Sequence, residues 1–179
     1  MLFEGLSLDI RPGDVIELTG PNGSGKTTLL RCLAGLTGDF DGEVTRASAL
    51  SYVGHRGGLN LQLTPQQNLR WSAAIEGSDA SRERMSALLD RVGLAGYEHT
   101  PCQQLSAGQQ RRAALARLAF GSAALWLLDE PLTALDDAGC AFVRELLERH
   151  RRAGGAALCA THQPLQIDAA RRHALGRAA

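Results

Sequence analysis

A glycine-rich loop near the start of the chain has the residue types that hold phosphate groups. The segment GPNGSGKT at 20–27 matches GxxxxGK[ST] without a mismatch. Its glycines let backbone N–H groups turn inward, and the N-terminus of a following helix adds about half a positive charge aimed at the same anion. Lys26 is expected to reach the β- and γ-phosphates, and the Thr27 hydroxyl to bind Mg²⁺. The predicted nucleotide-binding residues of this loop are Gly20, Pro21, Asn22, Gly23, Ser24, Gly25, Lys26, Thr27 and Thr28.

Two adjacent acids follow an apolar run later in the chain. The run LWLL at 125–128 leads directly into Asp129 and Glu130, as expected where a buried parallel strand delivers carboxylates to the edge of a sheet. Adjacent acids at a strand end are often only surface charges, but the phosphate loop favours a catalytic role. We expect Asp129 to hold the Mg²⁺ shell and Glu130 to accept a proton from an attacking water as general base.

The segment LSAGQ at 105–109 predicts a second helix N-terminus suited to an anion. Ser106 and Gln109 have the spacing of a capping box, so a helix begins at Ala107. A local capping role explains both residues, but it does not explain Gly108, because glycine in a helix costs about 1 kcal/mol relative to alanine. Close approach of a phosphate would explain this glycine.

The order of these motifs resembles that of ABC ATPases. LSAGQ, standing between the phosphate loop and LLDEP, looks like their signature motif, Asp136 in TALD like their D-loop, and His162 in ATHQ like their switch histidine. The resemblance implies a P-loop NTPase fold, ATP and Mg²⁺ as cofactors, and a head-to-tail dimer with a second ATP-binding subunit. In such a dimer, Ser106, Gly108 and Gln109 of one copy face the γ-phosphate held by Lys26 of the other. His162 would then stabilise that phosphate and position the water.

The flanks of the motifs extend the resemblance over nearly the whole chain. They are similar to the CcmA family, the haem-exporter ATP-binding subunits of cytochrome c maturation, at 105–117, 125–136, 161–165 and the pair Gly54–His55. This resemblance implies an ATPase peripheral to the cytoplasmic face of the bacterial inner membrane. Its partners would be an integral membrane subunit like CcmB and other cytochrome c maturation proteins. The sequence contains no haem-ligating motif of its own.

Two segments depart from the ABC pattern. After Val53, the chain reads Gly54, His55 and Arg56 where the family carries a glutamine that senses Mg²⁺ and the membrane partner. His55 is the candidate for that sensing position. The N-terminal part is short, so the small antiparallel β subdomain is expected to be trimmed, and Phe3 is the only aromatic that precedes the phosphate loop. For Phe3 a core role is favoured over an adenine platform.

Elements able to position these residues follow from the pattern of apolar residues. Apolar runs that alternate with helical periodicity indicate an α/β domain with a mainly parallel sheet and an inserted helical subdomain. The arginine-rich tail after Leu165 is expected to be a solvated final helix rather than a binding tail. We predict strands at 14–18, 124–128 and 156–160, and helices at 27–36, from Gln66 after a Thr64 capping box, through Met85 to Val92, from Ala107, and through Phe142 to Leu147.

Length and composition set the remaining bounds. A chain of 179 residues fits one domain over 1–179, which we divide into a core lobe at 1–56 and 105–179 and a helical subdomain at about 57–104. Its net charge of zero argues against a general nucleic-acid binder. Four dispersed cysteines indicate buried or idle cytosolic thiols, and no apolar run is long enough to cross a membrane.

Three functions compete on this basis. The first is an energy-coupling ATPase whose dimer closes on Mg-ATP and moves a membrane subunit, in haem export or with another substrate. The second is a non-transport ABC ATPase that grips nucleic acid, although such proteins tend to carry a long coiled-coil insertion or two ATPase domains. The third is a nucleotide-binding regulatory subunit without turnover, against which the intact Lys26, Asp129, Glu130 and His162 argue.

Overall fold

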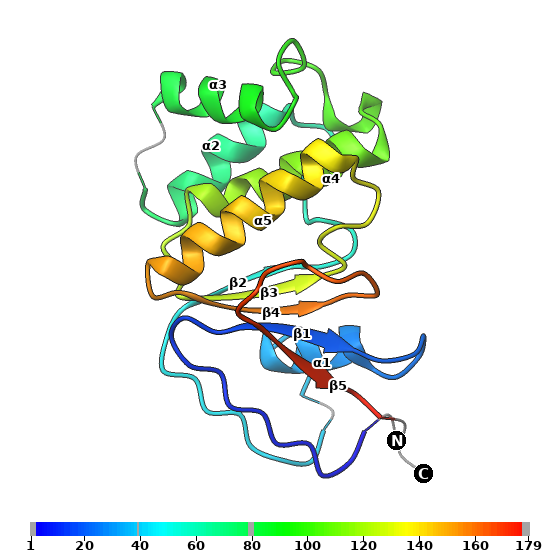
Figure 1. Ribbon diagram of the computed structural model, residues 1–179. Coiled ribbons are helices and arrows are strands. Elements are labelled where there is room, and N and C mark those ends of the chain that lie inside the picture. Colours follow the sequence, from blue (N-terminus) through cyan, green and yellow to red (C-terminus); the bar gives the residue numbers. More distant parts are fainter. Residues whose placement is uncertain (1–2, 39, 79–80, 177–179) are drawn as a thin grey trace. The chain divides into compact units, whose positions relative to one another are not determined.

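The computed structural model describes residues 3–38, 40–78 and 81–176, and it divides into two compact units (Figure 1). Residues 105–122 and 132–146, predicted as core lobe, lie in the second unit, and the predicted single domain of 1–179 with its helical subdomain stays a prediction. The first unit comprises Met1–Gly54, Ala123–Pro131 and Leu147–Ala179, and the second His55–Ser122 and Leu132–Leu146.

The first unit is built on a five-stranded parallel sheet in the order β2-β3-β4-β1-β5. Because β1, β4 and β3 are neighbours, the segments that leave their carboxyl ends meet at one edge, which is where ligands bind in open α/β sheets. The phosphate loop, the segment after Thr161 and the two acids leave from these ends. The strands are β1 (Val15–Thr19), β2 (Leu50–Val53), β3 (Leu125–Asp129), β4 (Ala156–Ala160) and β5 (Ala170–Ala174).

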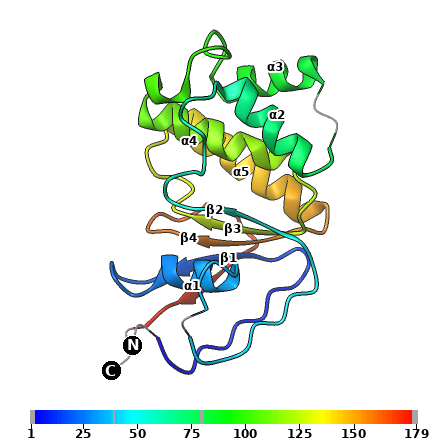
Figure 2. The ribbon, with the colours of Figure 1, turned by 180° about the vertical axis from the view of Figure 1, so that it is seen from behind.

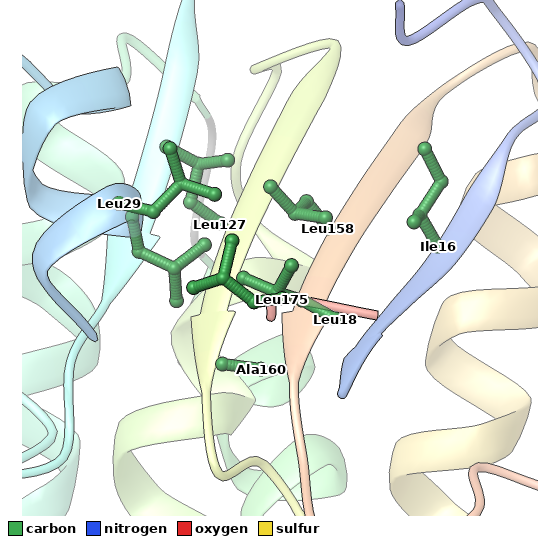
Figure 3. Packing of buried hydrophobic residues seen from close by; sticks show 8 residues of the cluster. Ile16, Leu18, Leu29, Leu127, Leu158, Ala160 and Leu175 are labelled. Atoms are coloured by element: carbon green, nitrogen blue, oxygen red, sulfur yellow. The ribbon is translucent and has the colours of Figure 1, made fainter. Parts of the chain in front are cut away.

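Apolar side chains of β1, β3 and β4 form the core of this unit together with helix α1 (Lys26–Leu33). Figure 3 shows Leu29 of α1 beside Leu127 and Leu158 of the sheet. The strand β4 is buried at every position, as expected for a parallel strand covered on both faces. Phe3 packs against this cluster, which confirms its favoured role in the core.

Helix α1 ends earlier than predicted. Its last residue is Leu33 rather than Leu36, because Gly35 takes φ 73°. The amides of Gly35 and Leu36 then bond back to the carbonyls of Cys32 and Arg31, which closes the helix.

The second unit is helical. Thr64 and Ser106 cap α2 and α4 through complete capping boxes, as predicted from their spacing to Gln67 and Gln109. Figure 2 shows α2, α3 and α4 together in this unit. Its elements are α2 (Pro65–Ile75), α3 (Arg82–Arg91), the short 3₁₀ turns Cys102–Gln104 and Arg117–Ala119, α4 (Ala107–Ala116), and α5 (Asp137–Arg152), which belongs to this unit as far as Leu146.

The prediction of a final helix after Leu165 is wrong, because residues 170–174 form β5. The sequence ARRHA lacks the alternation that signals a strand, but β1 offers a free edge whose backbone groups pair with this segment in parallel. Arg171 and Arg172 also meet Asp14 and Glu17 of the neighbouring segment. Tertiary pairing therefore overrides the local pattern here.

The sequence predicts a small antiparallel β subdomain, but the described residues contain no antiparallel strand pair. All the pairs of the sheet are parallel, and the segments 3–14 and 40–49 carry no strand.

None of the helices within 3–38, 40–78 and 81–176 has the length and apolar character needed to cross a bilayer. Cys32, Cys102 and Cys159 are buried as predicted, and burial raises the pKa of the Cys102 and Cys159 thiols.

Candidate functional site

The phosphate loop depends on its glycines. Gly20, Gly23 and Gly25 adopt φ values of 149°, 80° and 94°, which are unfavourable for residues that carry a side chain. A Cβ on Gly20 would also lie 2.6 Å from the Leu175 carbonyl oxygen and 2.8 Å from Ser24 Oγ. The buried Ser24 Oγ has no hydrogen-bond partner among the described residues, so it is a polar group available to an anion in the loop. The loop thus fits a phosphate ligand.

Lys26 is the only lysine of the chain, and its ammonium is held over this loop. The side chain is largely buried, and Nζ donates to the carbonyl oxygens of Gly20 at 2.7 Å and Pro21 at 3.1 Å. These two bonds hold the ammonium at the loop. An anion in the loop would meet both the ammonium and the N-terminus of α1. Thr28 is half-buried in α1, directly after Thr27.

The two predicted magnesium-binding residues lie together. Thr27 Oγ1 donates to Asp129, at 2.9 Å from Oδ2 and 3.2 Å from Oδ1, across a separation of 102 residues. Asp129 is buried at the end of β3, whereas Thr27 is exposed at the start of α1. The hydroxyl keeps a lone pair for a cation while its proton points toward the carboxylate.

Glu130 and His162 form the second contact at this edge of the sheet. His162 Nε2 lies 3.3 Å from Glu130 Oε1. The backbone N–H of Glu130 donates to the Ala160 carbonyl at 2.8 Å, which extends the β3–β4 pairing by one residue and brings the two side chains together. Glu130 has φ 51°, a strained value for a residue other than glycine and one that cannot be read from the sequence.

The signature-like residues belong to the second unit. Ser106 Oγ accepts from the Gln109 N–H at 3.2 Å, and Gln109 Oε1 accepts from the Ser106 N–H at 2.9 Å. Asp136 accepts from Arg112 Nη1 at 3.1 Å and from the Gly139 N–H at 2.9 Å. The Gly139 N–H first, and Arg112 next, hold the pKa of the Asp136 carboxyl below its usual value.

Gly108 has a structural reason that sequence inspection missed. A Cβ at this position would lie 2.6 Å from the Ala134 carbonyl oxygen, in the loop that precedes α5. Ala134 itself has φ 63°. The close backbone contact therefore explains the glycine without a ligand, and the approach of a phosphate at Gly108 stays a prediction.

The segment entering the second unit follows β2. Gly57 has φ 69°, and a Cβ there would meet Ala114 of α4 at 2.8 Å. Arg117 Nη1 donates to the Gly58 carbonyl at 3.2 Å, and burial lowers the pKa of its guanidinium. These contacts hold the segment after His55 and Arg56 against α4 and the 3₁₀ turn that follows it. The sensing role of His55 stays a prediction.

Comparison with known proteins identifies the group to which these features belong. The family model "ABC transporter" matches residues 3–133. The "Cytochrome c biogenesis ATP-binding export protein CcmA" of Hahella chejuensis is 48% identical over 93% of this chain and 84% of its own length. The protein of the same name from Methylococcus capsulatus is 47% identical over 93% of this chain and 86% of its length.

A solved structure adds a nucleotide complex to this comparison. It is the dimeric post-hydrolysis state of the ATP-binding cassette MJ0796 bound to ADP and Pi, with a TM-score of 0.80 and 25% identity. The match covers 97% of this chain and 86% of that one. The parallel α/β core and the phosphate loop are thus those of a nucleotide-binding cassette. This chain belongs to the ABC transporter family, as an ATP-binding ATPase subunit of the type that the cytochrome c biogenesis export proteins represent.

Proposed function

We propose that this chain hydrolyses ATP to drive an export step of cytochrome c biogenesis, through a membrane subunit that it contacts. The pair Glu130–His162 carries the proposal. The acid and the imidazole lie 3.3 Å apart at the sheet edge to which β1 also delivers the phosphate loop. A chain that only bound nucleotide would have no use for a strained carboxylate beside a histidine at this place.

Each of the site residues in the first unit then has one task in hydrolysis. Lys26 and the loop amides bind the β- and γ-phosphates, with Ser24 Oγ as a further donor. Glu130 accepts a proton from the attacking water, since its carboxylate is partly open to solvent. His162 stabilises the γ-phosphate and orients that water.

A magnesium ion fits the chemistry of Thr27 and Asp129. Both side chains offer oxygen atoms, and Thr27 Oγ1 is already oriented by the carboxylate at 2.9 Å. The protein supplies few ligands, because no group of three His, Cys, Asp or Glu side chains gathers in the described ranges. Most of the shell would therefore be phosphate oxygens and water. When bound, the ion supplies charge neutralisation on the phosphates.

We propose that turnover requires a second copy of the chain. Ser106 begins α4 with an exposed side chain, and the N-terminus of this helix is a site for an anion. In a head-to-tail pair, Ser106, Gly108 and Gln109 of one copy would face the γ-phosphate held by Lys26 of the other, beside Asp136. The structure of MJ0796 with ADP and Pi, described as dimeric, supports this arrangement by analogy.

The cellular role extends this proposal. The relatives are named as export proteins of cytochrome c biogenesis, which supports a position at the cytoplasmic face of the bacterial inner membrane. There the chain would work with an integral membrane subunit like CcmB, in a process that delivers haem. His55, at the entry to the second unit, is the proposed contact through which hydrolysis and the membrane subunit communicate.

Light scattering of Glu130→Gln, with and without Mg-ATP, tests the proposal first. Blocking proton acceptance should trap the closed pair, so the mass doubles only with Mg-ATP. The double variant Lys26→Ala, Glu130→Gln is the matched control and should stay monomeric. A variant that binds ATP yet never dimerises contradicts the composite site, unless adding the membrane subunit restores pairing. Absence of ATP binding to Glu130→Gln contradicts the proposal altogether.

A further inference from the structure

Glu17 places a carboxylate in the middle of the buried strand β1. Its side chain is 5% exposed, in a strand whose first four residues are all buried. Both oxygens are used, since Oε1 accepts from the Leu165 N–H at 2.6 Å and Oε2 from Arg172 Nε at 2.9 Å. A buried charge is costly unless it is paired and hydrogen-bonded, so this residue meets a specific need.

That need lies in the segment Thr161 to Leu165, which carries His162. At its start, the Thr161 N–H donates to the Leu18 carbonyl at 3.1 Å, and the Thr161 hydroxyl donates to the Gln163 carbonyl at 2.6 Å. At its end, the Leu165 N–H is bound by Glu17. The histidine thus stands between two fixed points, one of which is the buried carboxylate.

We propose that Glu17 is a positioning residue for His162. By fixing the Leu165 amide, it sets the path of the segment so that the imidazole stays beside Glu130. Leu165 is fully buried, and the bond from its N–H to Glu17 Oε1 at 2.6 Å adds a directional contact to that packing. The inference rests on the proposed role of His162 in hydrolysis.

The reach of Glu17, and not its charge, is what this role requires. A glutamine has the same length and its amide oxygen can accept from Leu165, while the exposed Arg172 can turn to solvent. An aspartate keeps the charge but is one methylene shorter, so it cannot bond both partners from the same backbone position. The two conservative variants therefore separate position from charge.

The test measures kcat and KM of ATP hydrolysis by the transporter complex that contains the chain. Glu17→Asp should lower kcat about tenfold and leave KM for ATP unchanged, because a displaced group loses catalysis but the phosphate loop stays intact. Glu17→Gln should hold kcat near the wild-type value. Asp14→Asn is the matched control, since Asp14 pairs with Arg171 between the same two segments, whereas the bond from Leu165 is made to Glu17. It should change neither parameter.

The outcomes distinguish this inference from the function on which it rests. Equal losses in Glu17→Gln and Glu17→Asp, or no loss in Glu17→Asp, overturn the positioning role. His162→Ala is measured in parallel. If His162→Ala turns over like wild type, the proposed role of His162 is wrong; if it is inactive while Glu17→Asp is normal, only the positioning inference is wrong. Thermal denaturation of each variant checks that a lost kcat does not come from a lost fold.

Discussion

The two units hold their functional residues in different ways. In the first unit, groups far apart in the sequence contact one another directly: Thr27 bonds to Asp129 and His162 lies beside Glu130. In the second unit, Ser106 and Gln109 bond to each other over three residues, as a capping box. Asp136 and Gly108 tie the loop before α5 to α4.

The contacts of each unit indicate which of them can act on a phosphate by itself. The first unit brings a cation, an acid and an imidazole to the edge of one sheet, and each can act on a bound nucleotide. The second unit offers a helix N-terminus whose neighbouring side chains satisfy one another. We infer that the first unit determines binding and chemistry, whereas the second determines a shape that a ligand or partner recognises.

The largest expected effect is at Lys26. Lys26→Met removes the ammonium from the phosphate loop and should lower ATP hydrolysis by about 10²–10³-fold or more. Lys26→Arg should fail almost as badly, because the planar guanidinium cannot take the place of a compact ammonium. ATPase assays and nucleotide titration measure both variants. Arg31→Lys, exposed in the same helix, is the control and should behave as wild type. Normal turnover in Lys26→Met would contradict the inference that the first unit carries out the chemistry.

Gly108 tests the second unit. Gly108→Ala places a Cβ 2.6 Å from the Ala134 carbonyl oxygen, so the unit should lose roughly 1–3 kcal/mol of stability despite the better helix propensity of alanine. Chemical denaturation measures the loss, and Gly38→Ala, which adds its methyl in open space, is the control. A variant that is as stable as wild type yet inactive would mean that Gly108 serves the approach of a ligand rather than packing.

Asp136 gives a smaller effect in the same unit. Asp136→Ala removes the acceptor for the Gly139 N–H and the partner of Arg112, so the denaturation midpoint should fall, but by less than for Gly108→Ala. Asp136→Asn keeps an oxygen that can accept from the Gly139 N–H and so cap the start of α5, and it should recover most of the loss. If both variants fall equally, the ion pair with Arg112 and not the cap stabilises this loop.

The smallest effect is a pH dependence within the first unit. His150 stacks on Trp126 with ring centroids 3.7 Å apart, and burial lowers its pKa. Below its ordinary pKa of about 6.5 the unfolded chain therefore binds a proton that the folded chain does not, and stability falls as the pH is lowered. His150→Phe keeps a ring against Trp126 and should flatten this dependence between pH 7.5 and 5.5 in denaturant titrations. An unchanged slope would assign it to other groups.

Short-range patterns predicted much of this molecule. The caps of α2 and α4 follow from residues three positions apart, and β4 was predicted at its observed bounds of 156–160. Both depend on interactions within a few residues or on burial of a continuous apolar run, which the sequence displays. The phosphate loop can be predicted for the same reason, since its glycines and Lys26 lie within residues 20–26.

Long-range pairing could not be predicted in the same way. The strand β5 exists because β1 leaves an edge free, and the sequence ARRHA carries no sign of it. The glycine at 108 is explained by a carbonyl oxygen 26 residues later in the chain, at Ala134. The charge of Glu17 in a buried strand is explained only by its hydrogen bonds with Leu165 and Arg172.

The chemical types can be read from the residues alone: a phosphate loop with one lysine, two acids after an apolar strand, and a capped helix with a glycine in its first turn. Which of these groups touch depends on the folded structure. The fold joins Thr27 to Asp129 and Glu130 to His162, and it gives the buried Glu17 its partners. Residue types and local spacing fix what each group can do, whereas the order of strands in the sheet fixes which groups meet.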